Sequence, residues 1–197
     1  TPPQPTLTNP TANARLRATT TLTATATDAS GIASVRFRRS PANQNTWTDI
    51  ATDTTSADGW SVSWDTTTVP DGLYDLRVIA TDAATPTPNT KTSTVIEDVR
   101  IDNTAPTISM AAPSHNATVS GASVTVSATA TDAGSGIDRV QFHLDCPGTA
   151  CGNLASDSTA SAGNTYTISW NTTTLANGQH TLSATAYDRA GNATTTS

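Results

Sequence analysis

The chain has 197 residues, a formal net charge of −6 and only 13% charged residues, a balance that argues against nucleic acid as a partner. Glu97 and Lys91 are the only glutamate and lysine, while Asp, Thr, Gly and Pro abound. Because helices are usually rich in Glu and Lys, this composition predicts an all-β protein. There is no apolar run of about 18 residues and no charged-then-apolar leader, so we expect this segment to make no membrane contact, with any signal peptide or anchor outside it.

The first half of the chain alternates between apolar and polar residues in short runs. Residues 1–10 are rich in Pro and Thr and predict an extended linker or an edge strand. Residues 21–27 alternate with period two, which indicates a strand with one buried face, and the next run places Val35 and Phe37 on one face. Residues 94–101 predict the last strand of this half.

The second half repeats the first. The segment 63–76, which begins Ser-Trp-Asp-Thr-Thr-Thr, recurs as 169–182, which begins Ser-Trp-Asn-Thr-Thr-Thr, and Asp82 recurs as Asp188 at the same spacing. The repeat predicts two domains, 1–103 and 104–197, joined end to end by a short linker. About seven short strands per hundred residues predict a Greek-key β-sandwich for each domain. Only 193–197 remain for the final strand, which we expect to be truncated.

The two cysteines, Cys146 and Cys151, enclose a short turn-rich loop. We expect a disulfide between them and therefore an oxidising compartment. A structural zinc site is disfavoured because it requires four ligands and no second Cys or His cluster accompanies the pair.

Several motifs resemble a known family. The DxxxGI turns, the W(D/N)TTTxxxGxxxL segments, the YDRAGN turn and the DNTAP linker resemble the bacterial Ig-like domains that are repeated in tandem in large surface and secreted proteins. The resemblance covers nearly the whole chain and implies two tandem Ig-like Greek-key sandwiches outside the cell. It implies a role in adhesin stalks, in spacers beside secreted carbohydrate-active enzymes or, less often, in binding modules.

No catalytic motif accompanies the three histidines, His115, His143 and His180, so we expect no enzyme activity. His180 occupies the place of Tyr74 in the first repeat, where an aromatic or imidazole ring can bond a backbone carbonyl and hold a strand corner. Lys91 lies among threonines after a Pro-rich loop, a poor position for the buried lysine that a self-formed isopeptide bond requires.

A calcium site is the sharpest hypothesis. If the domains stack end to end, Asp132 and Asp188 approach Asp102 and Asn103 of the linker, and oxygen ligands of this kind suit Ca²⁺. No cofactor is otherwise required. The alternative is that the aspartates only cap turns, because Asp132 and Asp188, like their counterparts in the first repeat, each begin one.

Trp47 lacks a counterpart in the second repeat and is a candidate ligand-binding residue, for example a platform for a sugar. The alternative is that it packs at an edge strand. Trp60, Trp64 and Trp170 alternate with polar residues and are predicted to lie in the core.

The predicted function is that of a structural stalk or spacer in an extracellular bacterial protein, with neighbouring repeats of the same chain as partners. One alternative is a module that binds a glycan or a host or cell-surface protein beside a secreted enzyme, through Trp47 or the loop of 146–151. A weaker alternative is a head-to-tail filament in which the open edge of the second domain accepts a strand from another chain.

Overall fold

The computed structural model describes residues 1–57, 59–145 and 152–197 and divides into two compact units, Thr1–Asn103 and Thr104–Ser197. The regular secondary structure of the described residues is β-strand, apart from one 3-10 turn, η1 (Thr66–Thr68). The predicted all-β, tandem Ig-like sandwich fold is confirmed.

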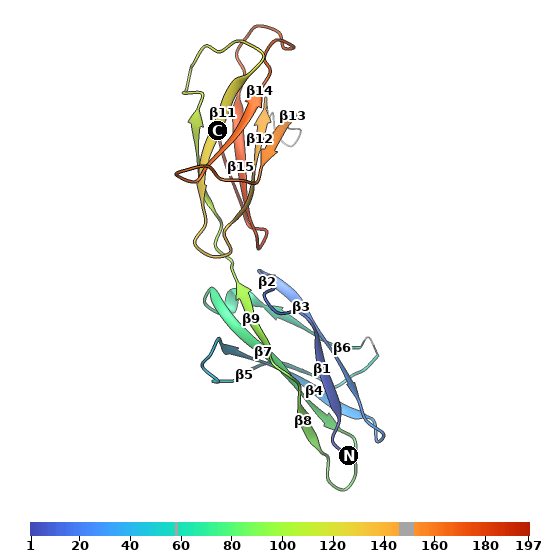
Figure 1. Ribbon diagram of the computed structural model, residues 1–197. Coiled ribbons are helices and arrows are strands. Elements are labelled where there is room, and N and C mark those ends of the chain that lie inside the picture. The colour runs from blue at the N-terminus through green and yellow to red at the C-terminus, as the bar shows by residue number, and fades with distance from the viewer. Residues whose placement is uncertain (58, 146–151) are drawn as a thin grey trace. The chain divides into compact units, whose positions relative to one another are not determined.

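Unit 1 consists of two packed sheets (Figure 1). The smaller has the order β1-β3-β6, and the larger has the order β2-β9-β7-β4-β5, with β8 paired to β7. Neighbouring strands are antiparallel except β2 and β9, which are parallel. The strands are β1 (Gln4–Asn9), β2 (Arg15–Leu16), β3 (Thr19–Thr27), β4 (Ile32–Pro41), β5 (Thr48–Asp53), β6 (Trp60–Asp65), β7 (Gly72–Asp82), β8 (Thr90–Thr92) and β9 (Ile96–Ile101).

Unit 2 repeats this arrangement with sheets of order β10-β11-β14 and β13-β12-β15-β16. In both units the chain changes sheet repeatedly, at β3–β4, β5–β6 and β6–β7 and again at β11–β12, β13–β14 and β14–β15, which is the connectivity of a Greek-key sandwich. The strands are β10 (Thr107–Ala112), β11 (Val124–Thr131), β12 (Ile137–Leu144), β13 (Gly152–Asp157), β14 (Thr165–Trp170), β15 (Leu182–Asp188) and β16 (Ala193–Thr196).

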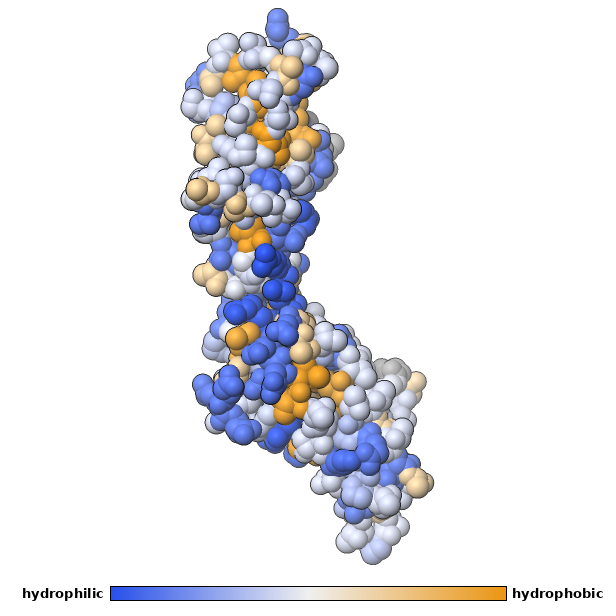
Figure 2. Space-filling model, viewed as in Figure 1, coloured by the Kyte–Doolittle hydropathy of each residue, from blue (hydrophilic) through white to orange (hydrophobic). Residues whose placement is uncertain are grey.

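Alternation of residues along the strands builds each core, since successive side chains point to opposite faces of a sheet. The predicted core tryptophans are buried, with exposed fractions of 7% for Trp60, 4% for Trp64 and 6% for Trp170. Unit 2 fills more of its core with alanine, at Ala128, Ala130, Ala184 and Ala186, and so depends on fewer large side chains. Figure 2 shows apolar positions in small groups among polar ones on the visible face of each unit.

The end of unit 1 differs from the expectation of one strand over 94–101. The chain first pairs with β7 over Thr90–Thr92, which form β8. It leaves β7 after Thr92 and pairs with β7 again as β9. Between the two strands, the Ser93 amide donates to the Val78 carbonyl and the Ser93 hydroxyl accepts from the Val78 amide. This local pairing replaces a regular ladder, which sequence alternation alone does not reveal.

Candidate functional surfaces

The aspartates that begin turns cap those turns through backbone hydrogen bonds. Asp82 accepts from the amides of Ala84 and Asn89 and from the Asn89 side chain, at 3.2, 2.8 and 2.7 Å. Asp188 repeats this pattern with the amides of Gly191 and Asn192 and the Asn192 side chain, at 2.6, 2.8 and 2.7 Å. The hydrogen bond from Asn89 is the main cause that lowers the pKa of Asp82, so this carboxylate stays ionised.

The other turn aspartates behave alike. Asp28 accepts from the Ser30 amide at 2.8 Å, and Asp132 accepts from the Gly136 amide at 2.7 Å. The hypothesis that these aspartates cap turns is therefore confirmed by their contacts. Capping of the turns does not exclude calcium binding, because each carboxylate oxygen has more than one lone pair.

Of the four predicted calcium ligands, Asp132 and Asp188 lie together within unit 2, with carboxylate oxygens within 4.8 Å of each other. The Asn103 side chain instead forms hydrogen bonds within unit 1, where it ties the end of the unit to other segments. Its side-chain oxygen accepts from the Ala18 amide at 2.7 Å and the Thr66 hydroxyl at 3.2 Å, and its amide nitrogen donates to Thr66. Asp102 follows β9, and its backbone amide donates to the Leu16 carbonyl at 3.0 Å. The calcium site stays a prediction.

The strand corner is built by Tyr74 in unit 1 and by His180 in unit 2. The Tyr74 hydroxyl donates to the Pro70 carbonyl at 2.9 Å, and its ring meets Trp64 edge-on with centroids 6.4 Å apart and planes at 83°. The His180 ring meets Trp170 with the same separation and angle. The equivalence that the repeat alignment predicted is confirmed.

His180 differs from Tyr74 by having two ring nitrogens, and each faces an acceptor. Nδ1 lies 2.6 Å from Asp145 Oδ2, and Nε2 lies 3.1 Å from the Ala176 carbonyl. Only the protonated ring donates at both positions. The Asp145 hydrogen bond is accordingly the main cause that raises the pKa of His180, and the same bond lowers the pKa of Asp145.

Sequence reasoning missed the role of Asp145. It also accepts from the Thr181 amide at 2.7 Å, so it ties the end of β12 to the start of β15. Its position directly before the cysteine loop was the available signal. The predicted disulfide between Cys146 and Cys151 lies outside the described residues.

Trp47 is half-buried beside a group of arginines on the larger sheet of unit 1. Its indole N–H donates to Asn45 Oδ1 at 2.8 Å, and the Arg77 guanidinium carbon lies 3.8 Å from the ring centroid. Arg38 donates to the Trp47 carbonyl at 2.8 Å and to Asp49 at 2.6 Å. One face of the indole is thus covered by Arg77. The arginines were also missed, although Arg36 and Arg38 are spaced to share one face of a strand.

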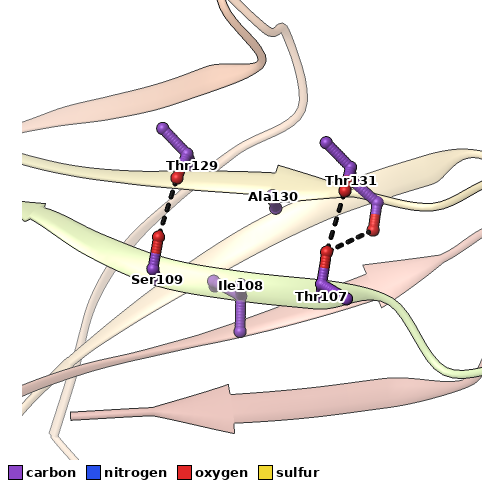
Figure 3. A pocket seen from close by; sticks show the side chains of 6 residues that line it. All are labelled: Thr107, Ile108, Ser109, Thr129, Ala130 and Thr131. Atoms are coloured by element: carbon purple, nitrogen blue, oxygen red, sulfur yellow. Dashed lines mark hydrogen bonds between the residues drawn. The ribbon is translucent and has the colours of Figure 1, made fainter.

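The smaller sheets present hydroxyl-rich outer faces. In unit 2, Thr107 and Thr131 bond through their hydroxyls at 2.8 Å, and Ser109 and Thr129 do so at 2.9 Å (Figure 3). A hollow of about 240 Å³ lies along these two hydroxyl pairs and is lined by Thr107, Ile108, Ser109, Thr129, Ala130 and Thr131. These six residues carry no charge and their hydroxyls bond one another, so the hollow offers no acid–base or metal chemistry.

Among the described residues, the other two histidines and the lysine lie apart from one another. His143 Nε2 lies 3.3 Å from the Thr185 hydroxyl, and burial lowers the pKa of His143, so this ring is neutral. His115 is exposed in the segment after β10. Lys91 is exposed and donates to the Gln4 side chain at 2.6 Å.

These features define the class of protein: Greek-key Ig-like modules whose surfaces carry turn-capping aspartates, paired hydroxyls and one arginine-rich face. The sequence profile of the Bacterial Ig domain family matches residues 3–78 and 106–184, which is most of the chain, so the chain belongs to the bacterial Ig domain family. This family consists of Ig-like structural or binding modules that are typically non-catalytic and often extracellular. The described residues include no helix with the length and hydrophobicity that a membrane-spanning helix needs.

No curated protein matches the chain in sequence. Among solved structures, the chain is similar to a marsupial T cell receptor with a TM-score of 0.55 and 10% identity, over 99% of this chain and 70% of that chain. At this identity the likeness shows the fold alone. The two tandem V-type regions of VCBP3, a v-region-containing chitin binding protein, match with 10% identity over 96% of each chain, but their TM-score of 0.29 supports no argument.

Proposed function

We propose that this segment is a structural spacer in an exported bacterial protein, where it holds other parts of the protein apart. The observation that carries the proposal is that each unit closes its own core, while only residues 102–106 join β9 to β10. Pro106 fixes its own φ and restricts the residue before it, so the connection has little freedom. Its partners in this role are neighbouring repeats of the same chain.

Small-angle X-ray scattering tests the spacer directly. The matched control replaces residues 104–106 by Gly-Ser-Gly, which keeps the length of the connection and removes its stiffness. We expect the unaltered chain to give the larger radius of gyration and the less flexible scattering profile. Identical profiles for the two proteins would refute a stiff spacer.

The same samples separate the spacer from the head-to-tail filament. Sedimentation velocity over a range of concentrations should give one monomeric species for a spacer that acts through covalent repeats. A sedimentation coefficient that rises with concentration would favour strand exchange between chains instead.

Calcium binding is a further part of the proposal. Asp132 and Asp188 supply two neighbouring carboxylates, and Asn192 donates to the Thr104 carbonyl at 3.3 Å at the same end of unit 2. A hard cation that takes six or more oxygen ligands would use such carboxylates together with water.

Thermal unfolding in EDTA and in excess calcium tests this site. An ion that binds only the native state raises the melting temperature of the protein. Asp132→Asn should abolish this rise, while the asparagine keeps a side-chain oxygen for the turn. Asp28→Asn is the control in the equivalent turn of unit 1 and should keep the rise. Equal melting temperatures with and without calcium would leave the aspartates as turn caps only.

A further inference from the structure

Three arginines gather on the outer face of the larger sheet of unit 1. Strands β4 and β7 are neighbours in this sheet (Figure 1). Arg36 and Arg38 lie on β4, and Arg77 lies directly opposite Arg38 on β7. Like charges directly opposite each other on adjacent strands destabilise a sheet. We name Arg36, Arg38, Arg77 and Trp47 the arginine face.

The arginine face is incompletely neutralised. Asp49 lies 2.6 Å from Arg38 Nε and 3.6 Å from Arg36 Nη1, so a single carboxylate serves two guanidinium groups. Arg77 takes part in no ion pair among the described residues, and its buried Nε has no hydrogen-bond partner there. Burial, and to a lesser extent the charge of Arg38, lower the pKa of Arg77.

The second unit shows that the fold does not require these charges. The strand registers place Gln141 at the position of Arg36, His143 at that of Arg38 and Ser183 at that of Arg77. Asn153 stands opposite His143 as Asp49 stands opposite Arg38. The same sheet position is therefore neutral in unit 2 and carries three guanidinium groups against one carboxylate in unit 1.

The geometry suits an extended anionic chain that lies on the sheet. Arg36 and Arg38 are spaced by about 6.5 Å along the strand backbone, and their guanidinium groups converge on Asp49, so with Arg77 they form one continuous cationic patch. A guanidinium pairs with a carboxylate through two parallel hydrogen bonds. Arg77 holds the Trp47 indole in place by stacking, which pre-organises an amphipathic ring beside the cations.

We propose that the arginine face binds an acidic polysaccharide, with the guanidinium groups pairing to uronate carboxylates and Trp47 packing against a sugar ring. The partly exposed indole favours a sugar chain over an acidic protein, because a ring offers an apolar face for packing while its carboxylate reaches the arginines. This binding activity goes beyond the spacer function and does not depend on it. It is confined to unit 1.

The experiment is affinity electrophoresis of the whole chain through gels that contain polygalacturonate, with neutral dextran gels as the reference. The test variant is Arg36→Gln/Arg77→Ser, which places the residues of unit 2 at these positions, so the variant should fold. Arg17→Gln/Arg100→Gln is the matched control because it removes the same charge elsewhere on unit 1. Thermal unfolding verifies the fold of each variant.

We expect retardation by polygalacturonate but not by dextran, weakened by added salt, and a loss of affinity of about tenfold or more in the test variant only. Equal weakening in the test and control variants would show a net-charge effect and overturn the proposal. No retardation of the unaltered chain would overturn it too. Stronger retardation by polyglutamate than by polygalacturonate would assign the face to an acidic protein and refute the sugar ligand.

Discussion

Removal of one core phenylalanine is predicted to destabilise one unit without the other. Phe37 in unit 1 and Phe142 in unit 2 occupy equivalent positions and are exposed by only 1% and 0%. Replacing a buried Phe by Ala costs about 3–5 kcal/mol, since transfer free energy is lost and a cavity remains. A domain of this size has about 5–15 kcal/mol of total stability, so either change removes a large share of it.

Differential scanning calorimetry in EDTA measures this effect. A loss of about 3 kcal/mol lowers the melting temperature of a domain of this length by about 12 °C or more. Phe142→Ala should move the transition of unit 2 by this amount, and Phe37→Ala should move that of unit 1. Because unit 2 lines much of its core with alanine, fewer side chains can move into the cavity, and we expect Phe142→Ala to be the more damaging change.

Two results would refute the reasoning. If either substitution lowers both transitions equally, the two cores form one cooperative structure and are not independent. If Phe142→Ala moves its transition by only a degree or two, the core of unit 2 relaxes around the cavity, and its alanine-rich packing is not the weak point that the burial pattern indicates.

Three further predictions concern individual contacts. Tyr74→Phe removes the hydrogen bond to the Pro70 carbonyl and should cost unit 1 about 1 kcal/mol in urea unfolding, with an unchanged m-value. Because the folded state raises the pKa of His180, the Asp145 contact should stabilise unit 2 fully below about pH 6.5 and lose this effect as pH rises through the folded-state pKa, measured by NMR titration and urea unfolding. Asp188→Ala removes hydrogen bonds to a charged group and should cost unit 2 about 2 kcal/mol, with faster amide exchange in the turn that follows.

Each of these predictions has a clear contrary result. His180→Tyr gives unit 2 the tyrosine corner of unit 1 and removes the ring that titrates. The stability of unit 2 should then no longer change with pH above pH 6, so an unchanged profile would place the titration elsewhere. For Tyr74→Phe, a stability equal to that of the unaltered chain would mean that water replaces the hydroxyl contact without loss. An unaltered exchange rate in Asp188→Ala would show that the turn holds its shape without the carboxylate.

Much of the fold could be predicted because alternation and repetition are local signals. The buried positions of Trp64 and Trp170 follow from period two, and the corner at His180 follows from its alignment with Tyr74. Turn capping by Asp188 follows from the ability of a short carboxylate to accept nearby amides. These features depend on residues close in sequence.

The surfaces could not be predicted, because they depend on strand register. Arg38 and Arg77 are 39 positions apart and meet only because β4 and β7 pair at that offset. The Asp145–His180 contact also joins residues from two different parts of the chain, one just after β12 and one just before β15, which are 35 positions apart. Alternation assigns each of these residues to a face but does not say which strand lies beside it.

The internal repeat separates what the fold needs from what it only tolerates. The core positions keep large apolar or small side chains in both units, whereas Arg77 becomes Ser183 and Tyr74 becomes His180 at equivalent positions of the same sandwich. Opposed arginines cost stability, and unit 2 shows that the sandwich forms without them. A destabilising feature that the fold does not require is best explained by a ligand whose charge offsets it, so exchanging residues between the units tests function while the fold stays in place.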